Sequence, residues 1–411
     1  MDVHPDIARL GTNRIPGRKK ENWDAGHDCP ASFISRRKTM RKNLDRFMNK
    51  PGTKIIILTL TNQCNLRCTY CYEHNKETRT MELQTALDII EREMTMDDGS
   101  DFVCIYYFGG EPYLEFEKIK AIHNFLGSHK WEKGWHGFTT TNGTMVHGEV
   151  QDWLIENFDT MEGYLSLDGT REMHNKNRSN SYDLIDIDFF LKYFPFAKMT
   201  VTSETLPNLA EGVIALHEKG FEVSSNLGEG IPWPEECTEI LAEQLQTLIN
   251  YYLEHPELTP STILRSGIQD LDPGTEHPKR FCGVGPMMRS YDTDGIAYPC
   301  HAFAPLCIGK EKAEASKKLD FSCPLCMEEV DEKCRNCPLI GNCPTCYGIN
   351  YSACGNVYHI TDDCCRMMKV QFLANAMFQY QQYRLGRKEF KSEEAELKFL
   401  RNVKAVQELK L

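Results

Sequence analysis

Residues 54–71 read KIIILTLTNQCNLRCTYC and join a short, β-rich apolar run to a loop with three cysteines. Three residues separate Cys64 from Cys68 and two separate Cys68 from Cys71, a spacing that lets three thiolates of one loop face a common centre. A [4Fe–4S] cluster normally takes four thiolates, so a loop with three leaves one iron open to a substrate or a cofactor. We therefore expect an iron–sulfur site directly after the first strand of the core.

The same loop also admits a zinc site or a set of unrelated thiols. Zinc sites usually combine one pair of closely spaced cysteines with a second pair, which closes a tetrahedron. Near this loop only His74 offers a further ligand. The spacing therefore favours iron over zinc.

Short β-rich runs alternate with longer amphipathic stretches between residues 54 and 254. This alternation is typical of βα units that form a parallel sheet. The expected strands are 54–60, 103–108, 137–141, 163–167, 198–202 and 221–226, and the expected helices are 81–93, 114–126, 149–157, 184–193, 206–219 and 238–254. Six repeats are fewer than the eight of a complete barrel, so we predict an α/β fold with a partial (β/α)6 barrel.

Polar or glycine-rich motifs follow the first four expected strands. They are TNQCNLRCTYC at 61–71, GGEP at 109–112, TNGT at 141–144 and SLDG at 166–169. The carboxyl ends of parallel barrel strands meet at one face, which is where barrel enzymes carry their sites. We expect all four motifs to line one site.

Composition and charge exclude several classes of protein. The 411 residues are 41% hydrophobic and 26% charged, as in ordinary globular chains of two or three packed units. The net charge of −12 would repel a phosphate backbone, so we expect no nucleic-acid partner. The longest apolar run is far shorter than the ~20 residues that cross a bilayer, and residues 1–20 lack the apolar centre of a secretory signal. We expect a cytoplasmic protein without membrane contact.

Prolines and then cysteines replace the βα pattern after residue 254, and most of the 18 cysteines follow this point. In a reducing cytoplasm, clustered thiols are more often metal or cluster ligands than disulfides. The expected division is an N-terminal extension at 1–50, a core at 51–275, a small cysteine-rich domain at 276–370 and a C-terminal helical segment at 371–411. Cys29, Cys104 and Cys237 lie outside both groups, and we expect them to be buried or incidental thiols.

The cysteine loop resembles the C-x3-C-x-(aromatic)-C motif of the radical S-adenosylmethionine (radical SAM) enzymes, with Tyr70 in the aromatic position. This resemblance implies a [4Fe–4S] cluster whose open iron chelates the amino and carboxylate groups of S-adenosylmethionine. One electron then splits the cofactor into methionine and a 5′-deoxyadenosyl radical, which abstracts hydrogen from the substrate. The resemblance also implies a reducing partner such as flavodoxin or ferredoxin.

Three further motifs extend the resemblance across the barrel. In the family, the glycines of GGEP let the backbone approach the methionine amino group, and the glutamate accepts its protons. The TNG and SLDG motifs lie near the cofactor or the substrate in relatives. The implied cofactor-binding residues are Gly109, Gly110, Glu111, Pro112, Asn142, Ser166 and Asp168.

The stretch 174–178 reads HNKNR and resembles the family's H-D-x-x-R motif. The resemblance implies that Arg178 meets the carboxylate of S-adenosylmethionine through a charge-assisted fork. Asn175 replaces the aspartate of that motif.

The C-terminal cysteines resemble the SPASM domain, which carries auxiliary iron–sulfur clusters in the pattern C-x(9–15)-G-x4-C, C-x2-C-x5-C-x3-C and a last cysteine. Cys346 comes one residue earlier than the pattern requires. The resemblance implies two auxiliary [4Fe–4S] clusters. The first would take Cys282, Cys300 and Cys346, completed by Cys307, Cys323, Cys326 or an open site, and the second would take Cys334, Cys337, Cys343 and either Cys365 or Cys364.

SPASM relatives characteristically modify peptides, so we expect a peptide or protein substrate and post-translational maturation. An alternative is an anaerobic sulfatase-maturating enzyme, which makes formylglycine. That group reads Y-P-C-D-F with the aspartate as base, whereas here His301 follows Cys300. Histidine accepts a proton near neutral pH, so His301 is the candidate catalytic base. Three consecutive C-x2-C pairs keep open a further alternative, a non-catalytic zinc or iron–sulfur interaction module.

Overall fold

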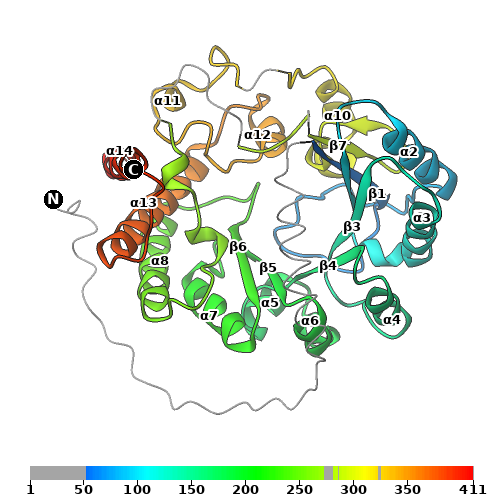
Figure 1. Cartoon of the computed structure of the whole chain (residues 1–411), viewed down its shortest axis with the longest axis horizontal. Coiled ribbons are helices and arrows are strands. Elements are labelled where there is room, and N and C mark those ends of the chain that lie inside the picture. Colours follow the sequence, from blue (N-terminus) through cyan, green and yellow to red (C-terminus); the bar gives the residue numbers. More distant parts are fainter. Residues whose placement is uncertain (1–51, 273–280, 286, 323–324, 411) are drawn as a thin grey trace.

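The computed structural model describes residues 52–272, 281–285, 287–322 and 325–410 (Figure 1). The expected N-terminal extension at 1–50 lies outside the described residues, as do Cys29 and Cys323. No helix in the described part of the chain is both long and apolar enough to span a bilayer.

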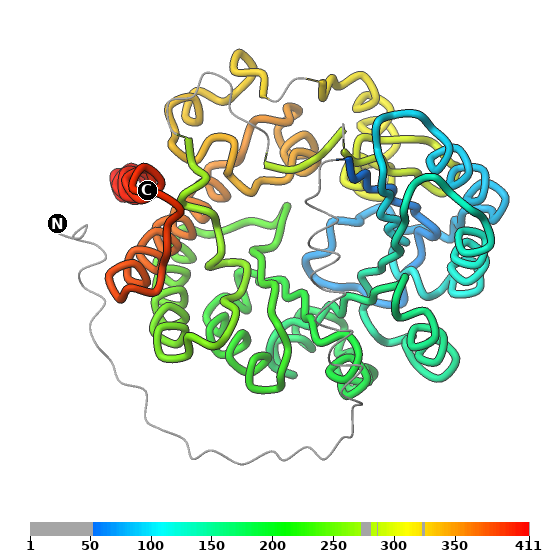
Figure 2. Tube along the Cα trace, viewed as in Figure 1, coloured from blue at the N-terminus to red at the C-terminus, as the bar shows by residue number. Residues whose placement is uncertain are grey.

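Eight strands form one sheet in the order β6-β5-β4-β3-β2-β1-β7-β8. The first six are parallel to their neighbours, which confirms the predicted α/β fold with a partial barrel. The six strands are β1 (Thr53–Thr61), β2 (Phe102–Gly109), β3 (Gly134–Thr141), β4 (Met161–Ser166), β5 (Phe196–Val201) and β6 (Glu222–Leu227). Figure 2 shows the chain winding through these strands in sequence order around a common centre.

Helices follow the strands and cover the outer face of the sheet (Figure 1). The six expected helices are present as α2 (Leu83–Thr95), α3 (Phe116–Ser128), α4 (Glu149–Glu156), α6 (Ile187–Tyr193), α7 (Leu209–Lys219) and α8 (Cys237–Glu254). A seventh, α5 (Arg171–Asn177), was not predicted. It begins where the hydroxyl of Thr170 accepts a hydrogen bond from the backbone N–H of Met173 at 3.3 Å. This short helix carries the chain from the SLDG motif to Arg178.

Two short strands from the cysteine-rich part of the chain extend the sheet beyond its six βα units. β7 (Met288–Tyr291) lies parallel to β1, and β8 (Ala297–Tyr298) lies antiparallel to β7. Neither strand is among the six expected from the sequence. The C-terminal part of the chain is therefore continuous with the barrel sheet.

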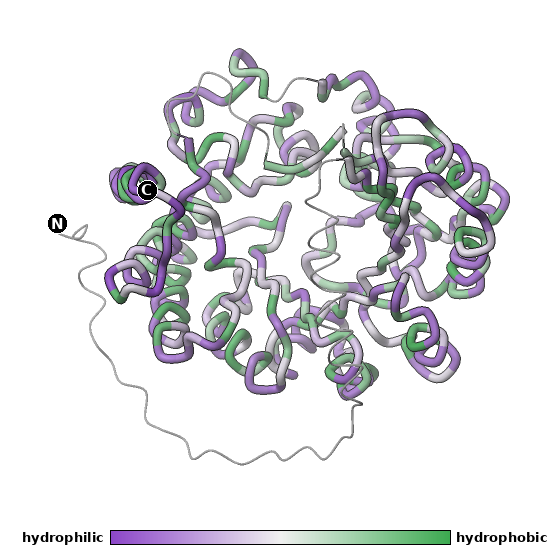
Figure 3. The backbone as a smooth tube through the Cα atoms, viewed as in Figure 1, coloured by the Kyte–Doolittle hydropathy of each residue, from purple (hydrophilic) through white to green (hydrophobic). Residues whose placement is uncertain are grey.

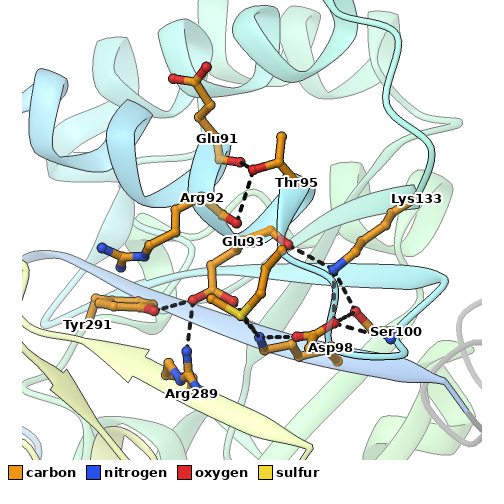
Figure 4. A network of polar contacts seen from close by, with 11 residues as sticks. Glu91, Arg92, Glu93, Thr95, Asp98, Ser100, Lys133, Arg289 and Tyr291 are labelled. Atoms are coloured by element: carbon orange, nitrogen blue, oxygen red, sulfur yellow. Dashed lines mark hydrogen bonds and ion pairs between the residues drawn. The ribbon is translucent and has the colours of Figure 1, made fainter.

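A buried polar network ties β7 to β1 and α2 (Figure 4). Glu93 of α2 is fully buried, and its carboxylate is bonded to Lys54 of β1 at 2.5 Å, to Arg289 of β7 at 3.2 Å and to the hydroxyl of Tyr291. Burial alone would raise the pKa of Glu93, but the bonds from Lys54 and Tyr291 lower it below its usual range. Removing one partner of such a buried set typically costs about 3–5 kcal/mol, so this network fixes the position of β7.

Alternation along the strands divides the sheet into two faces. The outward side chains of β5, for example, are Ala197, Met199 and Val201, and they pack into the main apolar core with the covering helices. The helices show hydrophobic and hydrophilic residues in turn, as expected for elements with one buried face (Figure 3). The opposite, inward face of each strand is thereby left to line the barrel.

The C-terminal part surrounds the open side of the barrel. It contains α9 (Pro305–Ile308), α10 (Lys310–Ser316), α11 (Glu332–Arg335), α12 (Tyr347–Cys354), α13 (Asp362–Arg384) and α14 (Glu393–Gln407). Short 3₁₀ helices are η1 (Pro112–Glu115), η2 (Tyr182–Leu184), η3 (Leu206–Asn208), η4 (Thr262–Leu264), η5 (Ile268–Asp270) and η6 (His301–Phe303). α13 begins earlier than the expected helical segment at 371, and it packs against α8.

Candidate active site

The three cysteines of the first motif lie in the loop that follows β1. All three are half-buried. Burial raises the pKa of Cys64 to about 11. Burial also raises the pKa of Cys68, and the opposing effect of the nearby Arg178 charge is smaller. Thiols held in this way need a cation or a metal before they ionise, because the thiolate is the form that binds metal.

Contacts with two other motifs fix this loop. The backbone N–H of Thr69 donates to the carbonyl of Asn177 at 2.9 Å, which joins the loop to the end of α5. The amide of Asn65 donates to Thr144 at 2.8 Å and accepts from the amide of Asn142 at 2.9 Å. The cysteine loop, the TNGT motif and the HNKNR stretch therefore meet at one end of the barrel.

Gly109 and Gly110 let the loop after β2 lie directly against the cysteine loop. A Cβ on Gly109 would lie 2.4 Å from the carbonyl oxygen of Thr61, and one on Gly110 would lie 2.2 Å from that of Gln63 and 2.9 Å from the Cβ of Cys64. Gly109 also has a φ of +151°, which side chains rarely adopt. Any larger residue at these positions would push the two loops apart.

Glu111 points into the protein and joins the loops that follow β2 and β3. Its side chain is only 1% exposed. Oε1 accepts hydrogen bonds from Thr141 at 2.8 Å and from the backbone of Tyr113 at 3.2 Å, and Oε2 accepts one from the backbone of Asn142 at 2.8 Å. Burial raises its pKa to about 7 despite these bonds. Pro112 follows and begins η1.

Asp168 is the centre of a second buried group. It is completely buried and forms an ion pair with Nε of Arg178 at 3.0 Å, without the straight geometry of a hydrogen bond. The hydroxyl of Tyr70 donates to it at 2.9 Å, as do Asn177 at 3.2 Å and the backbone of Thr200 at 2.9 Å. Asp168 is thus occupied by protein donors, so in this structure it positions Arg178 and Tyr70.

Arg178 lies beside the cysteine loop. Its Nη1 is 3.9 Å from Sγ of Cys68, and its guanidinium lies 5.2 Å from the centre of the Tyr70 ring. Burial would lower the pKa of Arg178, but the Asp168 carboxylate reverses this and raises it. Arg178 is therefore a permanent positive charge next to the three thiols.

The motif that carries Arg178 departs from the family pattern at Asn175, and the structure shows what this residue does. Its side-chain oxygen accepts a hydrogen bond from the backbone of Tyr182 at 3.0 Å. His174 accepts from the backbone of Asp168 at 3.3 Å and bonds to Ser181 at 3.0 Å, and burial lowers its pKa to about 4. Both side chains brace the loop around Arg178.

No family model matches the sequence. A cysteine-type anaerobic sulfatase-maturating enzyme of Clostridium perfringens is 30% identical over 157 residues, which are 34% of this chain and 39% of that protein. The radical SAM cyclopropyl synthase TigE of Paramaledivibacter caminithermalis is 20% identical over 171 residues, 37% of this chain and 36% of that protein. The structure of native anSMEcpe with bound AdoMet and Cp18Cys peptide matches with a TM-score of 0.64 and 19% identity over 82% of this chain and 100% of that one.

Parts of this chain are thus similar in sequence to radical SAM and sulfatase-maturating enzymes. The likeness to anSMEcpe shows that the two proteins share their fold over most of this chain. The chain spans less than two thirds of the length of the curated relatives that it matches.

Four cysteines line one cavity in the C-terminal part of the chain. The cavity has a volume of about 60 Å³, and its lining includes Cys334, Cys337, Cys343 and Cys365. Cys364 instead lines a neighbouring cavity of about 220 Å³, because adjacent residues of α13 point in different directions. The structure therefore separates the two candidates for the last ligand.

The thiols of the other expected group lie within electrostatic range of one another. Burial raises the pKa of Cys300 above its usual range, with further contributions from Cys346 and Cys282. Cys307 of α9 is 4% exposed. Burial raises its pKa, and the nearby acidic groups of Glu73, Cys300 and Cys346 raise it further. Cys307 therefore lies near Cys300 and Cys346. Cys326 packs against the same apolar cluster.

In the part of the chain that the structure describes, no three histidine, cysteine or acidic side chains come close enough to bind a single metal ion. A cluster makes a different demand, because each thiolate of a [4Fe–4S] cluster binds a different iron. Cys104 and Cys237 are buried thiols, as expected.

His301 lies at the start of η6 and faces the barrel interior. Its ring contacts Phe108, Tyr72 and Tyr106 at centroid distances of 4.7, 5.9 and 6.4 Å, and its Nδ1 is buried without a partner. Burial and then the charge of Lys198 lower its pKa to about 4. The sequence analysis did not single out Lys198, which lies between Ala197 and Met199 in β5.

Proposed function

We propose that this chain is a radical SAM enzyme that cleaves S-adenosylmethionine reductively and abstracts hydrogen from a peptide or protein substrate. The observation that carries this proposal is the contact between the three-thiol loop and Gly110 at the end of the barrel where Arg178 also lies. Two glycines without room for a Cβ, a buried carboxylate and a fixed cation surround the three thiols.

The residues present fit an iron–sulfur cluster with one open iron. Cys64, Cys68 and Cys71 would hold it, because they are the three closely spaced thiols of the loop. When bound, this cluster supplies the electron that cleaves S-adenosylmethionine and so starts hydrogen abstraction. The chain's own residues bind and orient the cofactor around that site.

Arg178 offers its terminal guanidinium nitrogens to a carboxylate, because Asp168 engages only its Nε. Glu111 keeps one lone pair of Oε2 for an amino group, since three protein donors use the others. Gly109 and Gly110 allow close approach of a ligand to the backbone. Asn142 and Ser166 border the same end of the barrel, and each of these polar residues is 7% exposed.

We further propose two auxiliary clusters in the domain at 276–370. The cavity lined by four thiols supports Cys334, Cys337, Cys343 and Cys365 as one ligand set. The electrostatic proximity of the remaining thiols supports Cys282, Cys300 and Cys346 as the other, and Cys307 is the described thiol placed beside them. The proposal also includes a flavodoxin or ferredoxin that delivers the electron. It places the protein in the cytoplasm.

A peptide substrate is favoured because the matching anSMEcpe structure contains a bound Cys peptide. The sulfatase-maturating alternative is favoured by the Clostridium perfringens relative. His301 separates the two, since it replaces the aspartate of that group and lies against aromatic rings. We expect neither the parent protein nor His301→Asp to form formylglycine on a Cys-type sulfatase peptide, measured by hydrazide capture and mass spectrometry. Aldehyde formation by the parent would favour the alternative.

The proposed function is tested by 5′-deoxyadenosine release from S-adenosylmethionine after anaerobic reconstitution and reduction with dithionite. The parent protein should release it without a peptide, and Cys64→Ala combined with Cys68→Ala and Cys71→Ala should abolish the release. Cys354→Ala is the matched control, because Cys354 is exposed and lies outside both ligand sets. A colourless protein that releases no 5′-deoxyadenosine would instead support the non-catalytic interaction module.

A further inference from the structure

Lys198 projects into the barrel from the middle of β5. The neighbouring side chains Ala197 and Met199 are buried in the core between the sheet and the helices. Because side chains alternate along a strand, Phe196, Lys198 and Thr200 share the opposite face. That face lines the inside of the barrel.

The register of the sheet places a serine on each side of Lys198. Lys198 pairs with Ser166 of β4 and with Ser224 of β6. Thr200 lies two residues further along the same face, about 7 Å away, and its backbone N–H donates to Asp168. Thr200 therefore links the strand face that carries Lys198 to the group formed by Tyr70, Asp168 and Arg178.

A band of aromatic rings lines the inside of the barrel around this lysine. Phe196 contacts Tyr164 at 5.2 Å between ring centroids, Tyr164 contacts Phe138 at 6.1 Å, and Phe138 stacks on Tyr106 at 4.5 Å. Tyr106 in turn lies 6.4 Å from His301. Lys198 thus lies on a face that combines hydroxyl groups with a band of aromatic rings.

The side chain of Lys198 is exposed to solvent, yet protein atoms surround it on most sides. We infer that it faces a solvent-filled hollow inside the barrel rather than the outer surface. Burial lowers the pKa of Lys198, and the charge of Arg178 lowers it further. Within the described residues no acidic side chain forms an ion pair with Lys198, since Asp168 pairs with Arg178. Lys198 therefore has no counter-ion in the described part of the chain, and a partly desolvated cation without a counter-ion is costly.

We propose that Lys198 binds the side-chain carboxylate of an aspartate or glutamate in the peptide substrate. This inference rests on the proposed function, and it adds an acidic residue to the description of the substrate. A carboxylate would neutralise the unpaired charge, accept hydrogen bonds from the flanking serine hydroxyls and leave the aromatic band for apolar neighbours in the peptide. Lys198 is a binding residue that sets how deep the peptide enters the barrel.

The test uses the full-length, anaerobically reconstituted protein with S-adenosylmethionine and three N-acetylated tripeptides. The first is acetyl-Phe-Glu-Phe-amide, the second is acetyl-Phe-Gln-Phe-amide, and the third is acetyl-Phe-Gln-Phe with a free C-terminal carboxylate. Binding is measured by saturation-transfer NMR titration. In parallel, protection of Lys198 from acetylation by sulfosuccinimidyl acetate is measured by mass spectrometry of the digested protein.

We expect the Glu-amide peptide to bind at least about tenfold more tightly than the Gln-amide peptide, as for other charge-assisted contacts. It should also protect Lys198 from acetylation. Lys198→Met should abolish the preference, whereas Lys198→Arg should retain it, and iron content and thermal unfolding should confirm that both variants fold. Equal binding of the Glu and Gln amides by the parent, or a preference that survives in Lys198→Met, would overturn the proposal. Preferential binding of the free C-terminus would also overturn it.

These outcomes are independent of the test of the proposed function. A parent protein that releases 5′-deoxyadenosine but shows no Glu preference retains radical SAM chemistry and loses the carboxylate site. A parent that shows the preference but releases no 5′-deoxyadenosine retains the carboxylate site and loses the proposed function.

Discussion

The backbone N–H of Asn142 donates a hydrogen bond to Oε2 of Glu111 at 2.8 Å. The two residues belong to different motifs, GGEP after β2 and TNGT after β3. Thr141 donates to the other oxygen of the same carboxylate, and the amide of Asn142 reaches Asn65 in the cysteine loop. One buried carboxylate therefore fixes three loops relative to one another, in addition to any contact with a cofactor.

This arrangement predicts that Glu111→Ala weakens binding of S-adenosylmethionine by roughly ten- to a hundredfold. The variant removes a charge-assisted contact of about 1.5–3 kcal/mol and leaves the Asn142 N–H without its acceptor. Isothermal titration calorimetry under anaerobic conditions measures the dissociation constant. Thr141→Val is the control, because it removes one neutral donor and leaves the charge in place, so its effect should be smaller. An unchanged dissociation constant in Glu111→Ala would remove Glu111 from the cofactor site.

The separation of the cysteines into a barrel loop and a C-terminal domain predicts about three [4Fe–4S] clusters, or ~12 iron atoms per chain, after anaerobic reconstitution. Changing Cys64, Cys68 and Cys71 together to Ala should remove about four iron atoms and leave the rest. Iron and acid-labile sulfide analysis measures both proteins. Loss of all iron in the triple variant, or about four atoms in the parent, would show that the C-terminal thiols do not bind clusters independently.

The two cavities beside α13 predict different effects for adjacent cysteines. Cys365 lines the cavity that also contains Cys334, Cys337 and Cys343, whereas Cys364 lines the neighbouring one. Cys365→Ala should therefore lower the iron content or change the electron paramagnetic resonance spectrum of one reduced auxiliary cluster. Cys364→Ala, its matched control, should leave both unchanged. The reverse pattern would assign Cys364 as the ligand.

The sequence predicts the six barrel strands because each is a run of five or more β-rich residues followed by a helix long enough to show its period. It does not predict β7 and β8, which have four and two residues and form only because β1 offers an unpaired edge. Helix α5 is missed for a similar reason, since seven residues between two motifs give no clear periodicity.

Within the site, local motifs predict the cysteine loop and its neighbours, because the ligands of one loop lie a few residues apart and their spacing can be read directly from the sequence. Lys198 has no such signal. A lysine in a strand usually indicates a solvated position, and only the sheet's curvature and the covering helices decide that it faces the barrel. The choice between Cys364 and Cys365 likewise depends on the direction of α13 rather than on spacing.

A buried histidine away from the site predicts how stability depends on pH. His123 of α3 is 3% exposed, bonds to the hydroxyl of Thr160 at 3.0 Å and contacts Trp135 and Trp153 edge-on. Burial, and then the neighbouring His136, lower its pKa to about 4. The unfolded chain, with a histidine pKa near ~6.5, takes up this proton first as the pH falls.

The contribution of His123 to stability is therefore fully present above about pH 6.5 and is lost as the pH falls from there towards about 4. The shift corresponds to roughly 3 kcal/mol in the free energy of unfolding. His123→Phe should flatten the pH dependence of that free energy over this interval by about one proton, measured by urea unfolding at pH 4.5 to 7.5. Thr160→Val keeps the histidine and removes its hydrogen bond, so it should lower stability yet retain the slope. If His123→Phe shows the same slope as the parent protein, His123 does not control acid stability in this fold.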